Sequence, residues 1–531
     1  MTEPRILVCE PIAEDGLRLL RQHAQVDVRP DLGARLREAI DGYEGLIVRS
    51  QTRVSAEVIN AATRLRVIGR AGVGVDNIDV EAASARGIVV VNAPTASNVA
   101  AAEHTLALML ALARHIPQAD ASVKAGRWER SRFLGVEVRG KTLGIIGLGH
   151  IGSEVARRAG GLGMRVIAYD PYVSPEYALK LNVTLVDLDT LLQQSDFLTV
   201  HVPLTPATRG LIGARELART KRGVRIINCA RGGIIDEAAL AAALRSGQVA
   251  GAALDVFTTE PPENSPFITD PDLRQRVVLT PHLGASTEEA QISAAVEVAE
   301  QVIAVLQGLP ARYAVNAPAI LPEQLQALAP YIRLAERLGR LFAQLSNGQL
   351  RHLEILYEGE IAEYDTTPLK AAVVKGYLQT VSPEHITLTN ALLMARVRGL
   401  TVVEHRQTAP AENYANLLTV RTAAAQFVHQ LSGTVVSGEP YIVRINQYWV
   451  HVLPTEGYLL LCYHIDRPGI VGKIGTLLGA ADINISFMQV GRRTRRGEAM
   501  TVLGLDEPVP EDLYHRLIAE AGLLAAKLVQ L

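Results

Sequence analysis

The sequence is poor in cysteine, in aromatic residues and in net charge. Of its 531 residues only Cys9, Cys229 and Cys462 are cysteines, 5% are aromatic, and 53 basic against 55 acidic residues leave a net charge of −2. Three isolated cysteines supply neither a disulfide framework nor paired metal ligands, so we expect a reducing compartment and thiols that pack as small hydrophobes. The charge balance argues against a generally basic nucleic-acid binder, and the few aromatics argue against stacking of single strands.

Long apolar segments and an apolar leader are also lacking. The N-terminus turns acidic at once, and the most apolar helical run, Thr105 to Ala113, is far shorter than a membrane span of about 20 residues. We therefore expect a soluble cytoplasmic protein. At roughly 100–200 residues per domain the length predicts three or four domains. The hydrophobic share of 48% can fill their cores, which excludes bulk disorder.

The first half of the chain alternates short β-branched runs with Ala- and Leu-rich stretches, which is typical of βαβ units and a parallel sheet. The first expected strands are Arg5–Cys9, Gly45–Val48, Val67–Gly69 and Ile88–Val91. A long helix to about His115 follows a break at Asn92, and a second series begins at Gly140. Its six expected strands predict a complete doubly wound dinucleotide domain. They are Thr142–Ile146, Arg165–Tyr169, Phe197–His201, Val224–Asn228, Gly251–Val256 and Val277–Thr280.

The C-terminal half has a different texture. A helix from about Thr287 to Gln307 has no strand after it, so we expect it to return and pack on the first domain. Residues 320–455 mix a helix over Leu325–Leu345 with strands such as Leu353–Tyr357 and contain no motif that indicates a chemistry. The last segment, 456–531, has the predicted order β-α-β-β-α, with a strand at Leu459–His464, a helix to about Ala480 and a strand from Asn484.

A glycine-rich motif indicates a dinucleotide site. Gly147-Leu-Gly149-His-Ile-Gly152 lies between an apolar strand and a helical stretch, as such a loop requires. Its glycines allow a tight turn, close approach of a pyrophosphate and close helix packing, and the helix N-terminus favours an anion. Asp170 ends the next strand, where a carboxylate accepts hydrogen bonds from ribose hydroxyls, and Pro171 follows it. Both features favour NAD over NADP. The alternative is a simple glycine turn with an exposed Asp170.

Three strand ends carry residues suited to hydride transfer. Arg231, Glu260 and His282 follow separate strands, whose carboxyl ends should meet at one edge of the sheet. His282 can take the hydroxyl proton, Glu260 can orient the imidazole, and Arg231 can grip a substrate carboxylate. Asp255 is expected near the nicotinamide, at its amide or its positive charge. The alternatives are solvated loop residues for Arg231 and Glu260 and a structural histidine for His282. No cluster has metal-ligand spacing, so we expect no metal.

A second group of cations indicates an anionic substrate. Arg49 and Arg70 end strands of the first domain, and the glycine-rich turn after Arg70 could form an anion nest. Arg130 and Arg132 add further positive charge. A phosphate dianion would use such a set, whereas a single carboxylate needs fewer charges. The alternative is that these are surface arginines at strand ends.

These motifs in combination resemble the D-isomer-specific 2-hydroxyacid dehydrogenases. The resemblance rests on the glycine motif with Asp170, on N-C-A-R-G-G (228–233), on D-V-F-T-T-E-P-P (255–262) and on P-H-L-G-A-S-T (281–287). Arg49 and Arg70 match the branch that acts on 3-phosphoglycerate in its long form, and residues 464–485 resemble an ACT regulatory domain. The implied fold is α/β. A Rossmann NAD domain (97–285) is inserted in a flavodoxin-like substrate domain (1–96 and 286–316), and an α+β intervening domain (317–455) and a ferredoxin-like ACT domain (456–531) follow.

The resemblance also implies an activity and its residues. The activity is NAD-dependent oxidation of 3-phosphoglycerate to 3-phosphohydroxypyruvate, the first committed step of serine synthesis, in a homo-oligomer that is a dimer or tetramer. The catalytic residues are Arg231, Glu260 and His282. The cofactor residues are Gly147, Gly149, His150, Ile151, Gly152, Asp170, Val202, Cys229, Ala230, Arg231, Asp255, His282, Gly284 and Ala285. The substrate residues are Arg49, Arg70, Gly72, Val73, Asn77, Arg130 and Arg132, and the contacts of L-serine as feedback inhibitor are His464, Asp466 and Asn484.

Several alternatives stay open at this point. Within enzymes they are a glyoxylate or hydroxypyruvate reductase, and reduction of 2-oxoglutarate as a side activity. Outside enzymes, the same fold could serve as a dinucleotide-sensing co-repressor, but the sequence shows no docking surface or disordered tail for that role. The ACT segment could also be degenerate and non-regulatory. The basic turn Arg492–Arg496 is expected to be a solvated hairpin tip.

Overall fold

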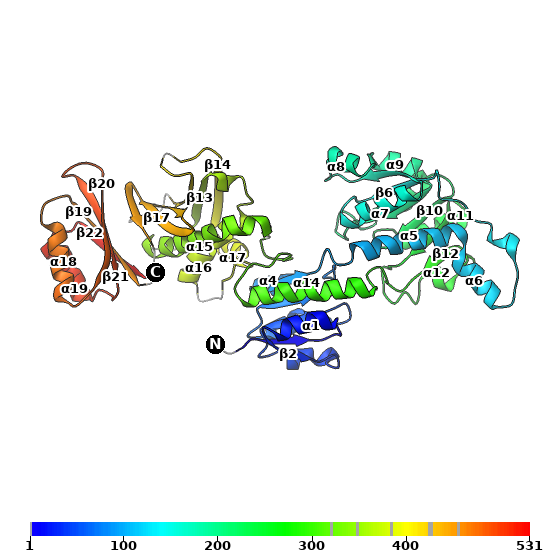
Figure 1. The fold of residues 1–531 in the computed structure, drawn as a ribbon, viewed down its shortest axis with the longest axis horizontal. Coiled ribbons are helices and arrows are strands. Elements are labelled where there is room, and N and C mark those ends of the chain that lie inside the picture. The colour runs from blue at the N-terminus through cyan, green and yellow to red at the C-terminus, as the bar shows by residue number, and fades with distance from the viewer. Residues whose placement is uncertain are drawn as a thin grey trace.

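Four sheets follow one another along the chain. The computed structural model describes residues 3–318, 322–346, 350–382, 386–411, 413–422, 428–453 and 457–530. Figure 1 shows the sheets as separate lobes: the first below the middle, the second at the right, and the third and fourth at the left. The α/β fold class predicted from the sequence is confirmed.

The first sheet is parallel, with the strand order β2-β1-β3-β4-β5. Its strands are β1 Arg5–Val8, β2 Gln25–Val28, β3 Gly45–Val48, β4 Val67–Arg70 and β5 Val89–Asn92. Its helices are α1 Glu14–Arg21, η1 Gly33–Arg35, α2 Leu36–Ala39, α3 Ala56–Ala61 and α4 Val80–Ala85. The edge strand β2 was not predicted, because only its inner positions are partly buried and its apolar pattern is weak.

The helix expected to return and pack on the first domain does pack on the first sheet. Helix α14, Glu288–Leu306, packs on α1, β4 and β5 of the first sheet. The approach is close: a Cβ added at Gly69 would lie 2.6 Å from a methyl of Val298 and 2.9 Å from one of Val302. A side chain at position 69 would therefore push the helix off the sheet.

The second sheet is also parallel and has the order β12-β11-β10-β9-β6-β7-β8. Its strands are β6 Thr142–Ile146, β7 Arg165–Tyr169, β8 Thr184–Leu185, β9 Phe197–Val200, β10 Val224–Asn228, β11 Val249–Leu254 and β12 Val277–Leu279. The prediction of six strands was wrong by one, because β8 has only two residues and no apolar run. The strand order reverses between β6 and β9, where doubly wound sheets bind ligands.

The second sheet has helices on both faces. They are α5 Asn98–Arg114, α6 Ile116–Lys124, η2 Arg130–Phe133, α7 His150–Gly161, α8 Pro175–Lys180, α9 Leu188–Gln194, α10 Ala214–Arg219, α11 Glu237–Ser246, α12 Pro266–Thr269 and α13 Pro271–Arg274. Two connections join the first and second lobes. The chain enters the second lobe from β5 into α5, which packs in that lobe, and leaves it from β12 into α14, which lies along the first lobe (Figure 1).

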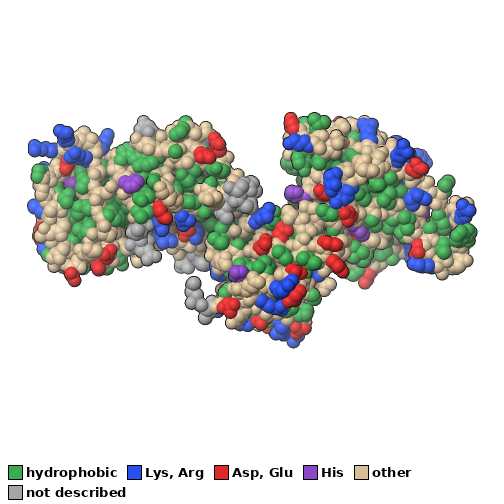
Figure 2. All heavy atoms as spheres, viewed as in Figure 1, with side chains coloured by type: hydrophobic (Ala, Val, Ile, Leu, Met, Phe, Trp, Pro, Cys, Tyr) green, Lys and Arg blue, Asp and Glu red, His purple; other side chains and the backbone are tan. Residues whose placement is uncertain are grey.

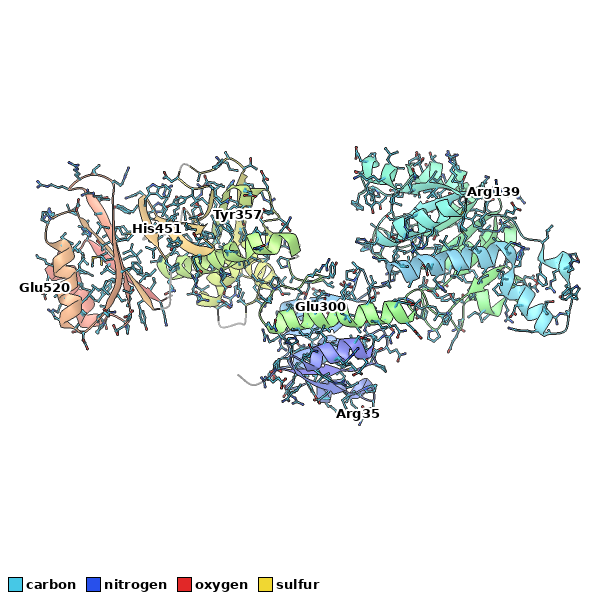
Figure 3. All side chains as sticks on the ribbon, viewed as in Figure 1. Arg35, Arg139, Glu300, Tyr357, His451 and Glu520 are labelled. Atoms are coloured by element: carbon cyan, nitrogen blue, oxygen red, sulfur yellow. The ribbon has the colours of Figure 1, made fainter. Side chains whose placement is uncertain are left out.

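The third lobe is a six-stranded sheet of order β14-β13-β15-β16-β17-β18, in which only β13 and β14 pair in parallel. Its strands are β13 His352–Gly359, β14 Thr401–Gln407, β15 Asn416–Arg421, β16 Gln430–Val436, β17 Glu439–Ile445 and β18 Tyr448–Val452. Its helices are α15 Pro322–Leu345, η3 Glu360–Ala362, α16 Thr367–Val381 and α17 Ala391–Val397. Tyr357 on β13 is fully buried inside this lobe (Figure 3).

The fourth lobe is antiparallel, with the order β20-β21-β19-β22. Its elements are β19 Tyr458–Ile465, α18 Ile470–Ala480, β20 Ile485–Arg492, β21 Glu498–Leu505, α19 Glu511–Ala521 and β22 Ala525–Gln530. The predicted order β-α-β-β-α was wrong in omitting β22, a strand whose burial does not alternate cleanly. β22 is an edge strand of this sheet and pairs with the interior strand β19.

The third and fourth lobes share one hydrophobic core. Leu461, Met500 and Val529 of the fourth sheet are buried together with residues of α15 and the third sheet. His451 on β18 lies where the two lobes meet (Figure 3), and its N–H donates to the Gln489 side chain on β20. One face of the fourth sheet is therefore covered by the preceding lobe, while α18 and α19 pack with the opposite face.

The third lobe also touches the first. Thr387 Oγ donates to the carbonyl of Gly87 at 3.2 Å, just beyond the end of α4. Of the predicted domain boundaries, the one between 455 and 456 lies outside the described residues, and the others stay predictions. None of the described helices has an apolar stretch long enough to cross a membrane. All three cysteines are free and buried, as expected, and burial raises the pKa of each thiol to about 12.

Candidate active site

The three motif glycines meet three different steric demands. Gly147 ends β6 with φ +93°, and a Cβ there would lie 2.6 Å from the carbonyl oxygen of His201. A Cβ at Gly152 would lie 2.1 Å from the Gly147 oxygen, so that position fixes the closeness of α7 to the loop. At Gly149 nothing lies within 4 Å of an added Cβ. That open space, at the N-terminus of α7, is the space that a pyrophosphate needs.

Asp170 ties the loop to the end of β7. Its carboxylate accepts a hydrogen bond from Leu148 N at 2.8 Å and another from Tyr172 N at 2.9 Å. A cavity of about 320 Å³ opens here, lined by Leu148, Gly149, His150, Tyr172, Val173, Ser174 and Tyr177. A cavity at the glycine loop, next to the carboxylate of Asp170, fits a dinucleotide with free ribose hydroxyls. Ile151 follows His150 in the first turn of α7, and Val202 packs beneath Gly147.

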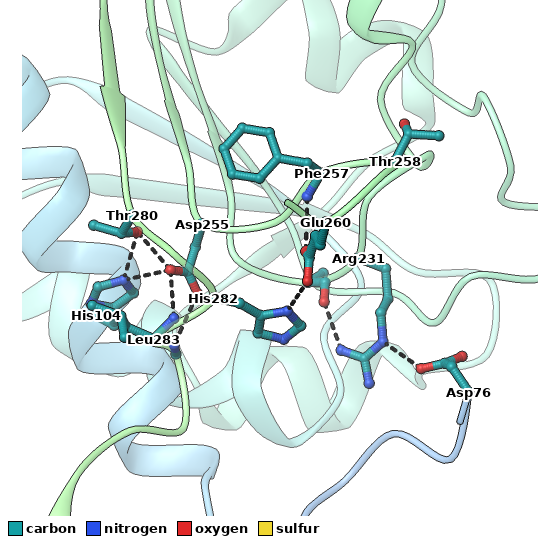
Figure 4. A network of polar contacts seen from close by, with 12 residues as sticks. Asp76, His104, Arg231, Asp255, Phe257, Thr258, Glu260, Thr280, His282 and Leu283 are labelled. Atoms are coloured by element: carbon teal, nitrogen blue, oxygen red, sulfur yellow. Dashed lines mark hydrogen bonds and ion pairs between the residues drawn. The ribbon is translucent and has the colours of Figure 1, made fainter. Parts of the chain in front are cut away.

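Glu260 and His282 form a hydrogen-bonded pair although 22 residues separate them (Figure 4). Glu260 Oε2 lies 2.8 Å from His282 Nδ1, and Glu260 Oε1 accepts from Phe257 N at 3.0 Å. Burial opposes ionisation of Glu260, but its bonds from His282 and Phe257 prevail and lower its pKa below the ordinary value. The carboxylate therefore holds Nδ1 as a donor, which leaves Nε2 to exchange a proton with a bound ligand.

Arg231, on the second lobe, forms an ion pair with Asp76 of the first lobe. It follows β10, and its guanidinium lies 3.4 Å from the carboxylate of Asp76 (Figure 4). The loop that carries it is held tightly, because a Cβ at Gly232 would lie 1.9 Å from the Phe257 oxygen. The other predicted residues of this loop, Cys229 and Ala230, lie at the end of β10 beside it. Arg231 thus stands between the Glu260–His282 pair and the opposing wall.

Arg70 ends β4 of the first lobe, where desolvation and nearby positive charges both destabilise its own charge. Its Nε is buried and has no hydrogen-bond partner among the described residues. Burial first, and then the charges of Arg231 and Arg49, lower the pKa of Arg70 to about 10. Three guanidinium groups from two lobes therefore face one region. An anion of charge −2 would relieve both the desolvation and the repulsion.

The predicted substrate turn is built around these arginines. Gly72 has φ +150°, and a Cβ there would collide with the guanidinium of Arg70. A glycine at position 72 therefore leaves the space that the Arg70 side chain occupies. Val73 follows in the same turn. Asn77, whose contact with substrate stays a prediction, donates to the carbonyls of Arg49 at 2.8 Å and Thr52 at 2.6 Å. Its side chain holds the Arg49 loop in place.

Arg130 and Arg132 lie elsewhere in the described structure. Both are exposed on η2, where Arg132 pairs with Glu129 at 3.3 Å and donates to Gln275 at 2.8 Å. Within the described ranges, no hydrogen bond or ion pair joins either arginine to Arg49, Arg70 or Arg231. In this single chain the structure does not bring them to the cleft.

The three residues predicted to bind an effector have separate partners. His464 is buried, and its Nε2 lies 2.8 Å from Thr501 Oγ. Asp466 accepts from the Arg492 side chain at 2.9 Å, and Asn484 donates to Asp506 at 2.6 Å. The basic turn that includes Arg492 is exposed, as expected, and basic side chains gather at that end of the molecule (Figure 2).

Two groups, the buried Glu10 and the half-buried His104, were missed by sequence reasoning. Glu10 follows β1 and accepts hydrogen bonds from the backbone of Arg49, Gln51 and Thr52, so it fixes the Arg49 loop. Its place after a strand was the signal that could have found it. His104 lies on α5 and contacts Asp255. A histidine inside an apolar helical run was its only signal. Among the described residues no three His, Cys, Asp or Glu side chains are placed to hold a metal.

Family models match three segments of the chain. Residues 106–284 match the NAD binding domain of the D-isomer specific 2-hydroxyacid dehydrogenases. Residues 327–446 match the D-3-phosphoglycerate dehydrogenase intervening domain, and residues 458–522 match the ACT domain. The matches include the third lobe, for which the sequence offered no motif.

Relatives match along the whole length. D-3-phosphoglycerate dehydrogenase of Synechocystis is 46% identical over 100% of this chain and 95% of its own. The protein of the same name from Bacillus subtilis is 40% identical over 99% of both chains.

Two of the solved structures that match cover about three fifths of this chain. A glyoxylate reductase from Paecilomyes thermophila aligns with 33% identity and a TM-score of 0.54, covering 61% of this chain and 100% of its own. The TT0316 protein of Thermus thermophilus aligns with 35% identity and a TM-score of 0.53, covering 59% of this chain and 99% of its own. The full-length identity decides the assignment: this chain belongs to the D-3-phosphoglycerate dehydrogenases of the D-isomer-specific 2-hydroxyacid dehydrogenase family.

Proposed function

We propose that the protein oxidises 3-phosphoglycerate to 3-phosphohydroxypyruvate with NAD, as an enzyme of serine biosynthesis. The proposal is supported by the buried Arg70 Nε, which has no partner among the described residues and feels the charges of Arg231 and Arg49, together with the hydrogen-bonded Glu260–His282 pair. A substrate with both a phosphate and a carboxylate can neutralise three guanidinium groups, and its hydroxyl can reach an imidazole. The relatives named above carry this activity in their names.

Separate groups of residues would bind the cofactor, bind the substrate and transfer the proton. The loop of Gly147, Gly149 and Gly152 would hold the pyrophosphate of NAD, and Asp170 its ribose hydroxyls; when bound, NAD supplies the hydride acceptor. Arg231 would bind the substrate carboxylate, and Arg70 and Arg49 the phosphate. His282 would take the hydroxyl proton on Nε2 as the carbon–hydrogen bond breaks, and Glu260 would stabilise the resulting imidazolium through Nδ1.

Turnover with phosphorylated and unphosphorylated substrates tests the proposal. NADH formation would be followed with 3-phosphoglycerate and with glycerate, and the reverse reaction with 3-phosphohydroxypyruvate and with glyoxylate. We expect the phosphorylated pair to give the higher kcat/KM by orders of magnitude. Preference for glyoxylate would instead favour the reductase alternative. No turnover with any of these substrates would favour a dinucleotide-sensing role.

Asp170 is expected to set the preference for NAD. The variant Asp170→Asn keeps the size of the side chain and removes the charge that would repel a ribose 2′-phosphate. We expect the ratio of kcat/KM with NAD to that with NADP to fall by about 10-fold, since one repulsive contact is worth roughly 1.4 kcal/mol or more. Steady-state kinetics with both cofactors measures the ratio, and an unchanged ratio would contradict this role.

We further propose that L-serine regulates the enzyme through the fourth lobe. The match to the ACT domain supports regulation by a small molecule. Asp466 and exposed Asn484 are the proposed contacts for its amino and carboxylate groups. His464 is the weakest member of the predicted set, because it is buried and engaged by Thr501.

Inhibition by L-serine is expected to depend on Asn484. In Asn484→Ala the concentration of L-serine for half inhibition should rise about 10-fold or more, because a hydrogen bond to a charged group is lost at the effector. The initial rate without serine should stay unchanged, and D-serine serves as the control ligand. A wild-type enzyme that L-serine does not inhibit would contradict the proposal.

The same proposal includes a homo-oligomer in a reducing compartment. Trp128 and Leu134 near η2 are 79% and 86% exposed, which is unusual for large apolar side chains on a free surface. A partner subunit that covers them would also cover Arg130 and Arg132. The free, buried cysteines support the compartment.

A further inference from the structure

A second histidine–carboxylate pair lies behind the first. His104 Nε2 is 3.1 Å from Asp255 Oδ1 and 3.2 Å from Thr280 Oγ (Figure 4). Asp255 has no exposed surface, whereas the His104 side chain is 20% exposed. Neither His104 nor Thr280 takes part in the hydride transfer proposed for this site, so the pair has a different role.

The loop that carries His282 needs external support. His282 has φ +57°, a left-handed conformation that is costly for a residue with a Cβ. Asp255 supplies the support at three consecutive residues. Its carbonyl accepts from His282 N at 2.9 Å, and its carboxylate accepts from Leu283 N and Gly284 N, each at 2.8 Å. The backbone around the imidazole is therefore set by the position of one buried carboxylate.

The protonation of the pair follows from its donors. Burial opposes the charge of Asp255, but the hydrogen bonds from His104, Thr280 and the two backbone N–H groups prevail and lower its pKa. An ionised carboxylate can only accept, and Thr280 already donates to Oδ1 at 2.5 Å. His104 must therefore carry its proton on Nε2 and donate it to Asp255.

His104 also joins the two connections between the lobes. It lies on α5, which begins the passage into the second lobe, whereas Leu283 and Gly284 begin the passage out of it. The two connections are close, because a Cβ added at Gly284 would lie 3.9 Å from that of Ala101 on α5. The bond from His104 to Asp255 is thus a polar link between both connections at the base of the catalytic loop.

We propose that His104 is a positioning residue that, by donating to Asp255, holds the His282 loop in the geometry for proton transfer. The inference rests on the proposed function, because its readout is hydride transfer. Without the donor, Oδ1 of Asp255 keeps only Thr280 and Leu283 N, and the strained loop is free to relax. Arg49, Arg70 and the glycine motif make no contact with this link in the described structure, so we expect substrate and the pyrophosphate of the cofactor still to bind.

The matched variants His104→Gln and His104→Asn test the inference. The Gln amide nitrogen lies about as far along the side chain as imidazole Nε2, whereas the Asn amide reaches only the Nδ1 position. We expect His104→Asn to lower kcat by about 10- to 100-fold with KM for 3-phosphoglycerate within threefold of wild type, as for a misplaced reacting group. His104→Gln should recover most of kcat, and Glu103→Gln, the exposed neighbour on α5, should behave as wild type.

An isotope effect separates positioning from general loss of structure. With 3-phosphoglycerate deuterated at carbon 2, the isotope effect on kcat should rise in His104→Asn and return toward the wild-type value in His104→Gln. Equal kcat and equal isotope effects in Asn and Gln variants would overturn the inference, as would a loss confined to KM or to NADH affinity. An inactive wild type would instead contradict the proposed function.

Discussion

Replacing His282 by alanine is expected to lower kcat by about 10³-fold while the protein still binds NADH. The reason is that Nε2 of His282 is the group placed to take the hydroxyl proton, and a positioned general base contributes roughly 10²- to 10⁴-fold. Glu260→Gln should lose less, because the amide oxygen can still accept from Nδ1 but carries no charge to stabilise the imidazolium. Turnover with 3-phosphoglycerate and NADH titration by fluorescence measure the two effects.

The stability of the His282 and Glu260 variants, and its dependence on pH, provides the control for these losses of activity. Both variants should unfold near the wild-type temperature, since both side chains are partly exposed. Full activity of His282→Ala would remove this residue from the mechanism. Because the pKa of Glu260 is lowered in the folded state, the hydrogen bonds to its carboxylate stabilise the fold above the ordinary carboxyl pKa. That contribution is lost as the pH falls through the folded-state pKa, so wild type should lose more stability on acidification than Glu260→Gln.

Replacing Arg70 by methionine is expected to lower kcat/KM for 3-phosphoglycerate by about 10²- to 10³-fold. Truncating one partner of a buried charged contact costs roughly 2–5 kcal/mol, and each 1.4 kcal/mol is a factor of ten. Without substrate, Arg70 is half-buried and repelled by Arg231 and Arg49, and its buried Nε has no hydrogen-bond partner among the described residues. Its removal relieves that cost, so the melting temperature of the ligand-free variant should equal or exceed that of wild type.

Inorganic phosphate distinguishes a ligand site from a structural cation. Phosphate should raise the melting temperature of wild type, because it binds the folded state only, and should raise that of Arg70→Met much less. Arg86→Met is a control in the same lobe, since Arg86 follows α4 and donates to the backbone carbonyls of Ile59, Asn60 and Ala62. A variant of Arg70 that is destabilised and still responds fully to phosphate would contradict the anion site.

Much of the architecture could be predicted because its signals are local. Strand runs, the glycine motif and the residues after strands β7, β10, β11 and β12 are features of short segments, and parallel strands place their ends at one edge. The misses have the same origin. β2, β8 and β22 have weak or short apolar patterns, and only pairing with neighbouring strands makes them regular. Tertiary pairing, not propensity, fixes such segments.

The sequence alone determined the chemistry that this protein carries: a dinucleotide loop, an acid–base pair and arginines for an anion. Tertiary structure alone decided how these groups meet. It brought Arg231 of the second lobe to 3.4 Å from Asp76 of the first, left the Arg70 Nε with no hydrogen-bond partner among the described residues, and set the Asn77 side chain to hold the Arg49 loop. It also placed His104 against Asp255, 151 residues away. Such contacts arise from the packing of distant segments, which no local pattern encodes.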